Sequence, residues 1–132
     1  MKFSLLALLV FVVACSTSDS IPANVFVGTW RLATYCKPTS TTACTTITVP
    51  TDKSVLVTFD SNGQYTETYQ NTTPAEYGFL SGSGNYSIEN KDLRIRTFLM
   101  SSMAGQLVKV VSVDSKRLVL NPFSNGEYIF VR

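Results

Sequence analysis

Few side chains in this chain of 132 residues are suited to catalysis. The sequence has no histidine, which excludes histidine-based catalytic triads and histidine zinc sites. It contains neither a Ser-x-x-Lys nor a Gly-x-Ser-x-Gly motif, and its nine acidic residues are scattered along the chain. A hydrolase needs an activated nucleophile, a pair of carboxylates or a metal. We therefore expect a protein that is not an enzyme and that holds no metal or other cofactor.

Glu67 is the carboxylate with the most informative neighbours, because it lies between Tyr65 and Tyr69 at a spacing of two. Residues at this spacing share one face of a strand, so Glu67 points inward if the tyrosines do. A buried carboxylate needs hydrogen-bond donors, and the two hydroxyls can supply them. The pattern predicts a ligand pocket that contains Tyr65, Glu67 and Tyr69. A register shift of one residue would instead place Thr66 and Thr68 inside.

The N-terminus has the composition of an export signal. Lys2 precedes an apolar run, residues 3–14, that is shorter than the ~20 residues needed to span a bilayer. The run ends in Val-Val-Ala-Cys15, which resembles a bacterial lipobox, where the signal is cut before a cysteine that carries the lipid. This resemblance predicts a lipoprotein signal peptide over residues 1–14 and a palmitate-bearing membrane anchor on Cys15. The alternative is an ordinary signal peptide with an incidental cysteine.

The next segment, residues 15–24, is small and polar and is expected to be a short tether. Ser16 follows the cysteine at the position where an aspartate would resemble the inner-membrane retention signal of many Gram-negative lipoproteins. We therefore expect an exported protein of the cell envelope, anchored in the outer membrane.

Cys36 and Cys44 remain as an even pair once Cys15 carries the lipid. Two thiols could begin a metal site, but the sequence offers no further cysteine or histidine to complete it. In an exported, oxidising setting the pair predicts a disulfide between Cys36 and Cys44 with a structural role.

The rest of the chain, residues 25–132, alternates short apolar stretches with turn signals. This rhythm is typical of β-sandwiches and barrels. Asn62-Gly63 and Asn125-Gly126 favour tight hairpin turns, and connections this short join antiparallel neighbours. We expect an all-β fold, a single antiparallel up-and-down β-barrel of about eight strands. The predicted strands cover residues 26–35, 45–49, 54–60, 64–70, 82–89, 92–97, 106–114, 117–121 and 127–132.

Alternation along these strands assigns one face to the interior and turns Arg94 and Arg96 to solvent. Besides Tyr65, Glu67 and Tyr69, the expected inward residues are Trp30, Leu32, Thr34, Val55, Val57, Phe59, Tyr86, Leu93, Ile95, Leu118, Leu120 and Phe130.

Gly28-Thr29-Trp30 resembles the Gly-x-Trp opening strand of lipocalins. Five later segments resemble successive segments of the lipocalin-like lipoproteins common in Bacteroidetes. These segments are residues 59–65, 84–88, 93–95, 110–120 and 128–130. The resemblance covers residues 26–132 and implies a lipocalin-like barrel. The chain departs from the family pattern in the Cys36–Cys44 insertion and in the long connection 71–83.

The resemblance also implies that a basic residue near the last strand packs over Trp30 as a cation–π contact. Arg132 matches this role by position, and Arg31 and Arg117 are the alternatives.

Two connections carry unusual apolar residues. The loop 98–105 contains Phe98, Met100 and Met103, which could cap a cavity, contact a partner or membrane, or fold inward as part of the core. We include these three residues with Tyr65, Glu67 and Tyr69 as candidate ligand contacts. The longer connection 71–83 contains Tyr77-Gly-Phe-Leu80, which could form a neighbouring lid.

Eleven basic residues nearly balance nine acidic ones, which argues against a nucleic-acid partner. The sequence thus predicts a monomeric, lipid-anchored barrel that binds a small apolar molecule without catalysis. The alternative function is a protein-interaction module, an inhibitor or accessory subunit of an envelope complex, built on a filled barrel. Whether the interior is hollow distinguishes the two.

Overall fold

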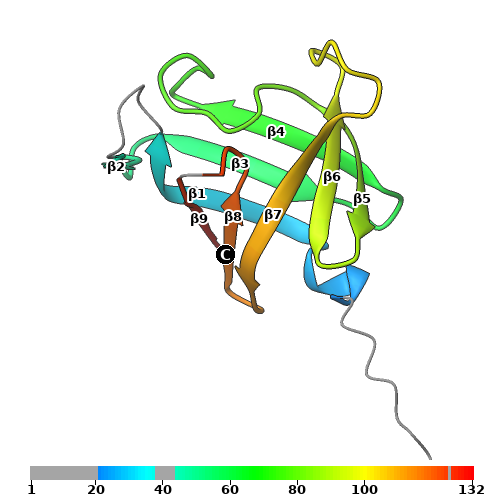
Figure 1. Ribbon diagram of the computed structural model, residues 1–132. Helices are drawn as coiled ribbons and strands as arrows, with labels where there is room; N and C mark the ends of the chain where they lie inside the picture. Colours follow the sequence, from blue (N-terminus) through cyan, green and yellow to red (C-terminus); the bar gives the residue numbers. More distant parts are fainter. Residues whose placement is uncertain (1–20, 38–43, 125) are drawn as a thin grey trace, which may run out of the picture.

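The computed structural model describes residues 21–37, 44–124 and 126–132, so the predicted signal peptide and Cys15 lie outside the described residues. Nine strands and one short 3₁₀ helix make up this part (Figure 1). They are η1 (Ala23–Val25), β1 (Gly28–Lys37), β2 (Thr45–Thr48), β3 (Ser54–Phe59), β4 (Gln64–Gln70), β5 (Gly84–Glu89), β6 (Asp92–Thr97), β7 (Gln106–Val113), β8 (Arg117–Asn121) and β9 (Tyr128–Val131).

Eight of these strands close into an antiparallel barrel. Each strand from β3 to β9 pairs with the next along the chain, and β1 pairs with both β3 and β9 to complete the circle. Thr34 and Tyr35 of β1 pair with β9 and also with β2. Because a strand has two edges, β2 must lie on the edge of β1 that faces away from β9. Near the start of β1, the same edge pairs with β3.

The predicted strands are confirmed, each within two residues of its observed ends. The first strand differs most, since it was expected to begin at Phe26. Residues 23–25 instead form a 3₁₀ turn and Phe26 has helical backbone angles, so that β1 begins at Gly28.

The interior is filled by the side chains that strand alternation assigned to it. The largest side chains without exposed surface are aromatic: Phe26, Trp30, Phe59 and Phe130, with Tyr65 almost completely buried. Thr34 is the exception to the predicted face. The pairing register of β1 with β9 shifts between Leu32 and Thr34, so that Tyr35 is buried instead and Thr34 is only half-buried.

The closed end of the barrel is built around Trp30. Its indole Nε1 donates a hydrogen bond of 2.9 Å to the carbonyl of Phe26. The guanidinium of Arg132 lies 3.8 Å from the centroid of the ring, which confirms Arg132 over Arg31 and Arg117 as the cation partner. Arg132 also donates to the backbone carbonyls of Val25, Val27 and Ser115.

Gly28 is required beside this contact. Its φ is +130°, and a Cβ atom there would lie 2.7 Å from Nη1 of Arg132. A larger residue would therefore strain the backbone and displace the guanidinium from the tryptophan.

The predicted disulfide between Cys36 and Cys44 is present, with the two Cα atoms 5.4 Å apart. It joins the end of β1 to the residue that precedes β2. Within the described ranges, no helix has the length and apolar character needed to cross a bilayer.

Candidate functional site at the barrel mouth

The end of the barrel opposite η1 is formed by the longer connections, and we call it the mouth. In Figure 1 the connections 71–83 (green) and 98–105 (yellow) lie at this end, whereas η1 lies at the other. Tight turns of two to four residues close the η1 end, so the side chains of a variable site gather at the mouth.

Glu67 lies just inside the mouth and is 8% exposed. Its Oε2 accepts a hydrogen bond of 2.8 Å from the Tyr65 hydroxyl, and its Oε1 accepts one from the Tyr69 hydroxyl. The backbone N–H groups of Phe79 and Leu80 donate to the same two oxygens over 3.0 and 3.1 Å. The inward orientation of Glu67 is thus confirmed, and the one-residue register shift is wrong.

The two backbone bonds to Glu67 hold the connection 71–83 across the mouth. They place the ring of Phe79 on the interior, with its centroid 5.2 Å from that of Tyr128 and 5.3 Å from that of Phe130. Phe79 is buried as a result. The Tyr77–Leu80 segment therefore covers the mouth, as expected of a lid, and Phe79 is its covering side chain.

A cleft of about 220 Å³ remains beside Phe79. It is smaller than the pockets of roughly 300–1,000 Å³ that hold drug-sized ligands. Four aromatic residues form much of its lining, together with one carboxylate. The lining residues are Tyr35, Pro74, Ala75, Glu76, Gly78, Phe79, Ser81, Phe123 and Tyr128.

The carboxylate and the burial change the ionisation of the surrounding phenols. Burial is the main cause that raises the pKa of Tyr65 and Tyr69 far above the usual value of 10, and the hydrogen bonds and charge of Glu67 add to it. Burial, then the nearby Tyr35, then Glu67 raise the pKa of Tyr128 to about 12. The negative charge of Glu67 therefore acts on a residue that lines the cleft.

The structure separates the candidate ligand contacts into two groups. Tyr65, Glu67 and Tyr69 come together at the mouth. Phe98 and Met103 are 85% and 84% exposed and Met100 is half-buried, so the loop 98–105 does not fold inward as part of the core.

Phe98 and Met103 border shallow grooves on the outer wall of the barrel. Phe98 lines one of about 200 Å³ near the junction of β4 and β5, and Met103 lines one of about 280 Å³ across β5 and β6. Neither side chain lines the mouth cleft.

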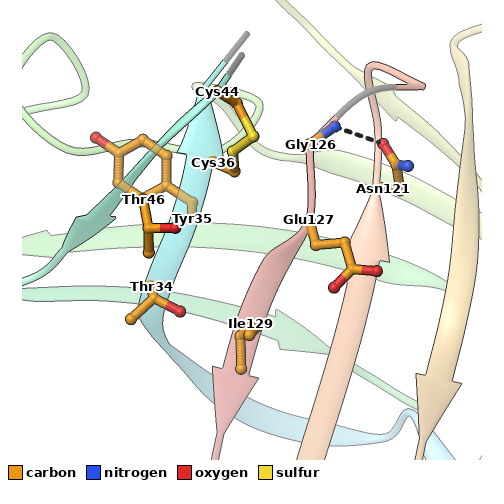
Figure 2. Close-up of a pocket in the computed structure, with 9 residues that line it drawn as sticks. All are labelled: Thr34, Tyr35, Cys36, Cys44, Thr46, Asn121, Gly126, Glu127 and Ile129. Carbon is orange, nitrogen blue, oxygen red and sulfur yellow. Dashed lines mark hydrogen bonds between the residues drawn. A yellow bond between two sulfur atoms is a disulfide. The ribbon is translucent and has the colours of Figure 1, made fainter.

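A larger cleft of about 440 Å³ lies on the outer wall beside the disulfide. Figure 2 shows Thr34, Thr46 and the Cys36–Cys44 bridge on one side and strands β8 and β9 on the other. Ile129 lines this cleft between the buried Tyr128 and Phe130, which places the cleft on the outer wall. Tyr35 lines this cleft as well as the mouth cleft.

None of the six predicted ligand contacts lines the mouth cleft, and sequence reasoning missed the three residues that line it from outside the connection 71–83: Tyr35, Phe123 and Tyr128. Tyr128 lies two residues before Phe130, so strand alternation could have identified it. Tyr35 could not be identified this way, because the irregularity after Leu32 changes the face of β1. Phe123 lies in the β8–β9 connection and has no periodic signal.

Comparison with known proteins agrees with this architecture. A family model described as a lipocalin-like domain matches residues 26–120. The structure is similar to the crystal structure of a lipocalin-like protein from Bacteroides uniformis ATCC 8492, with a TM-score of 0.60. The alignment has 18% sequence identity and covers 82% of this chain and 98% of the other, so it supports the fold alone. No curated protein matches the chain. Since the family model spans most of the barrel, the chain belongs to the lipocalin-like domain family.

Proposed function

We propose that this protein binds a small, largely apolar molecule at the barrel mouth, without catalysis, while a lipid on Cys15 holds it at the envelope membrane. The observation that carries the proposal is the aromatic cleft of about 220 Å³ under the connection 71–83. Ligand sites combine apolar walls with a few polar groups, and here Tyr35, Phe79 and Tyr128 supply the walls. The hydroxyl groups of Tyr35, Tyr128 and Ser81 and the carboxylate of Glu76 supply the polar groups.

The packed side chains between the closed end and the mouth limit the size of the ligand. Trp30, Phe59 and Phe130 have no exposed surface, and an eight-stranded barrel has room for packed side chains or one small ligand. A ligand is therefore expected at the mouth, above these side chains, and not along the whole barrel axis.

Native mass spectrometry of the protein purified from its own host tests this function. We expect a mass excess under native conditions that disappears on denaturation. Tyr128→Ala should lower the occupancy, whereas Phe98→Ala on the outer wall should not. Equal native and denatured masses, beyond the covalent lipid, would contradict the proposal.

The second candidate is a protein-interaction module, and the exposed loop 98–105 favours it. Phe98, Leu99 and Met103 are each more than three-quarters exposed, which is unusual for large apolar side chains. In the same native spectra, a module of this kind would carry a second protein at fixed stoichiometry, and Phe98→Ala would release it. A binding protein would carry the small molecule instead.

Membrane attachment is tested separately by Cys15→Ala. We expect the variant to leave the membrane fraction after a salt and carbonate wash, while the unchanged protein stays. A variant that remains in the washed membranes would contradict the lipid anchor.

A further inference from the structure

The charge of the mouth can be derived from the partners of Glu67. Its two oxygens accept four hydrogen bonds, from two phenol hydroxyls and two backbone N–H groups. All four donors are neutral. Each oxygen already has two donors, so the carboxyl group needs no proton of its own and is present as the carboxylate. The four partners thus stabilise the negative charge without cancelling it.

The carboxylate that lines the cleft, Glu76, is already paired. Glu76 lies 3.0 Å from the ammonium of Lys53 and accepts a further hydrogen bond from Thr72. This pair contributes no net charge. None of the nine residues that line the cleft is a lysine or an arginine. Glu67 does not line the cleft itself, but its negative charge acts on Tyr128, and no residue that lines the cleft or bonds to Glu67 carries a positive charge.

The aromatic walls of the cleft, like the negative charge of Glu67, favour a positively charged ligand. Tyr35 and Tyr128 are stacked, with centroids 5.1 Å apart and ring planes at 20°, and Phe79 and Phe123 pack against Tyr128 from two further directions. The face of an aromatic ring attracts a cation through its quadrupole, and this attraction is strongest where water is excluded. An anion placed here would meet aromatic rings and the carboxylate of Glu76, with no basic residue in the lining.

We propose that the mouth cleft selects small organic cations, in which an ammonium group carries a compact alkyl body, and excludes carboxylates of the same size. This inference rests on the proposed function, because it assigns a ligand class to the same cleft. The alkyl body would lie against Tyr35, Phe79 and Tyr128. The ammonium charge would be held by the ring faces and by the field of Glu67.

Three probes of nearly equal size test the sign of the charge on the unaltered full-length protein. They are choline, 3,3-dimethylbutan-1-ol, in which a carbon replaces the quaternary nitrogen, and 3,3-dimethylbutanoate. By calorimetric titration, we expect choline to bind about tenfold more tightly than the alcohol, and the carboxylate to bind more weakly than either. The advantage of choline should shrink at high salt.

Glu67→Gln then identifies the source of the selectivity. It removes the charge with little change in volume, so choline should lose affinity several-fold while the alcohol does not. Glu89→Gln is the matched control, since Glu89 pairs with Arg94 at the β5–β6 hairpin. If Glu67→Gln does not fold, Tyr128→Leu should reduce the preference for choline by removing a ring face.

The outcomes separate this inference from the proposed function. Equal affinity for choline and the alcohol, or tighter binding of the carboxylate, would overturn cation selection and leave the binding function in place. Binding of none of the three probes would also overturn it, and the native mass spectra would then decide the proposed function alone.

Discussion

Each end of the barrel has one charged side chain beside aromatic residues, but the charge has the opposite sign and binds different parts of the chain. At the closed end, Arg132 lies over Trp30 and donates to carbonyls that are more than 100 residues away in the sequence. At the mouth, Glu67 points inward and accepts from the N–H groups of one nearby loop. The closed end therefore ties distant segments together, whereas the mouth holds a single connection that can be released without opening the barrel.

The largest expected effect is at the closed end. Trp30→Ala should destabilise the protein by about 3–5 kcal/mol, because it removes a fully buried ring together with its hydrogen bond and its cation contact. Denaturant unfolding measures this. Trp30→Phe, the control, should recover much of the loss. A cost below about 1 kcal/mol for Trp30→Ala would show that the closed end is not the more strongly fixed end.

At the mouth, Glu67→Ala should cost about 2–3 kcal/mol, since it leaves hydroxyl and amide donors without their acceptor. Thr68→Ala on the same strand is exposed and should change the free energy of unfolding by less than about 0.5 kcal/mol. Faster amide exchange at Phe79 and Leu80 should accompany the loss in Glu67→Ala. Unchanged exchange at these two amides would contradict the role of Glu67 in holding the loop.

Alkaline pH should destabilise the packing of the tyrosines at the mouth before it affects the closed end. Tyr65, Tyr69 and Tyr128 have raised pKa values in the folded protein, mainly because they are buried. The unfolded chain loses these protons near pH 10 and the folded protein only above it. Their contribution to stability is therefore fully present below pH 10 and is lost as pH rises through the folded pKa, about 12 for Tyr128.

Absorbance at 295 nm follows the ionisation of the phenols. We expect the more exposed phenols to titrate first and Tyr65 and Tyr69 only as the protein unfolds. Reversible titration of all six tyrosines near pH 10, with the fold intact by circular dichroism, would contradict the burial of this cluster.

The smallest effect is expected on the outer wall. Phe98→Ser should change the free energy of unfolding by less than about 0.5 kcal/mol, because the side chain is 85% exposed. Neither choline nor alcohol affinity should change. A loss of stability above 1 kcal/mol would mean that the loop 98–105 packs against the barrel in solution.

The strands could be predicted because each depends on local alternation. In β3, buried residues alternate strictly with half-buried ones from Val55 to Phe59, and the same pattern continues through Tyr65 and Glu67 in β4. Short turns then leave antiparallel pairing as the possible connection. The inward position of Glu67 follows from this alternation, and so do its two hydroxyl donors.

What could not be predicted depends on pairs of residues far apart in the sequence. Tyr35 reaches the mouth because β1 changes register against β9, and nothing near Leu32 marks that change. The bonds from Phe79 and Leu80 to Glu67 depend on the path of a loop without periodicity. The buried carboxylate Glu67 behind the lid was therefore predictable, whereas the lining of the cleft, with its aromatic walls and Glu76, was not.

The closure of the barrel by β1 and β9 has a consequence for how the chain folds. Arg31 pairs with Val131, a separation of 131 − 31 = 100 residues. From β3 to β9 each pairing joins consecutive strands and can form as a hairpin, and β1 reaches β3 across the short strand β2. The pairing of β1 with β9 must wait for a much larger loop to close. Until then, the edge of β1 that will bind β9 is open to other extended chains. The interval between hairpin formation and barrel closure is thus the period in which this protein is most exposed to misassembly.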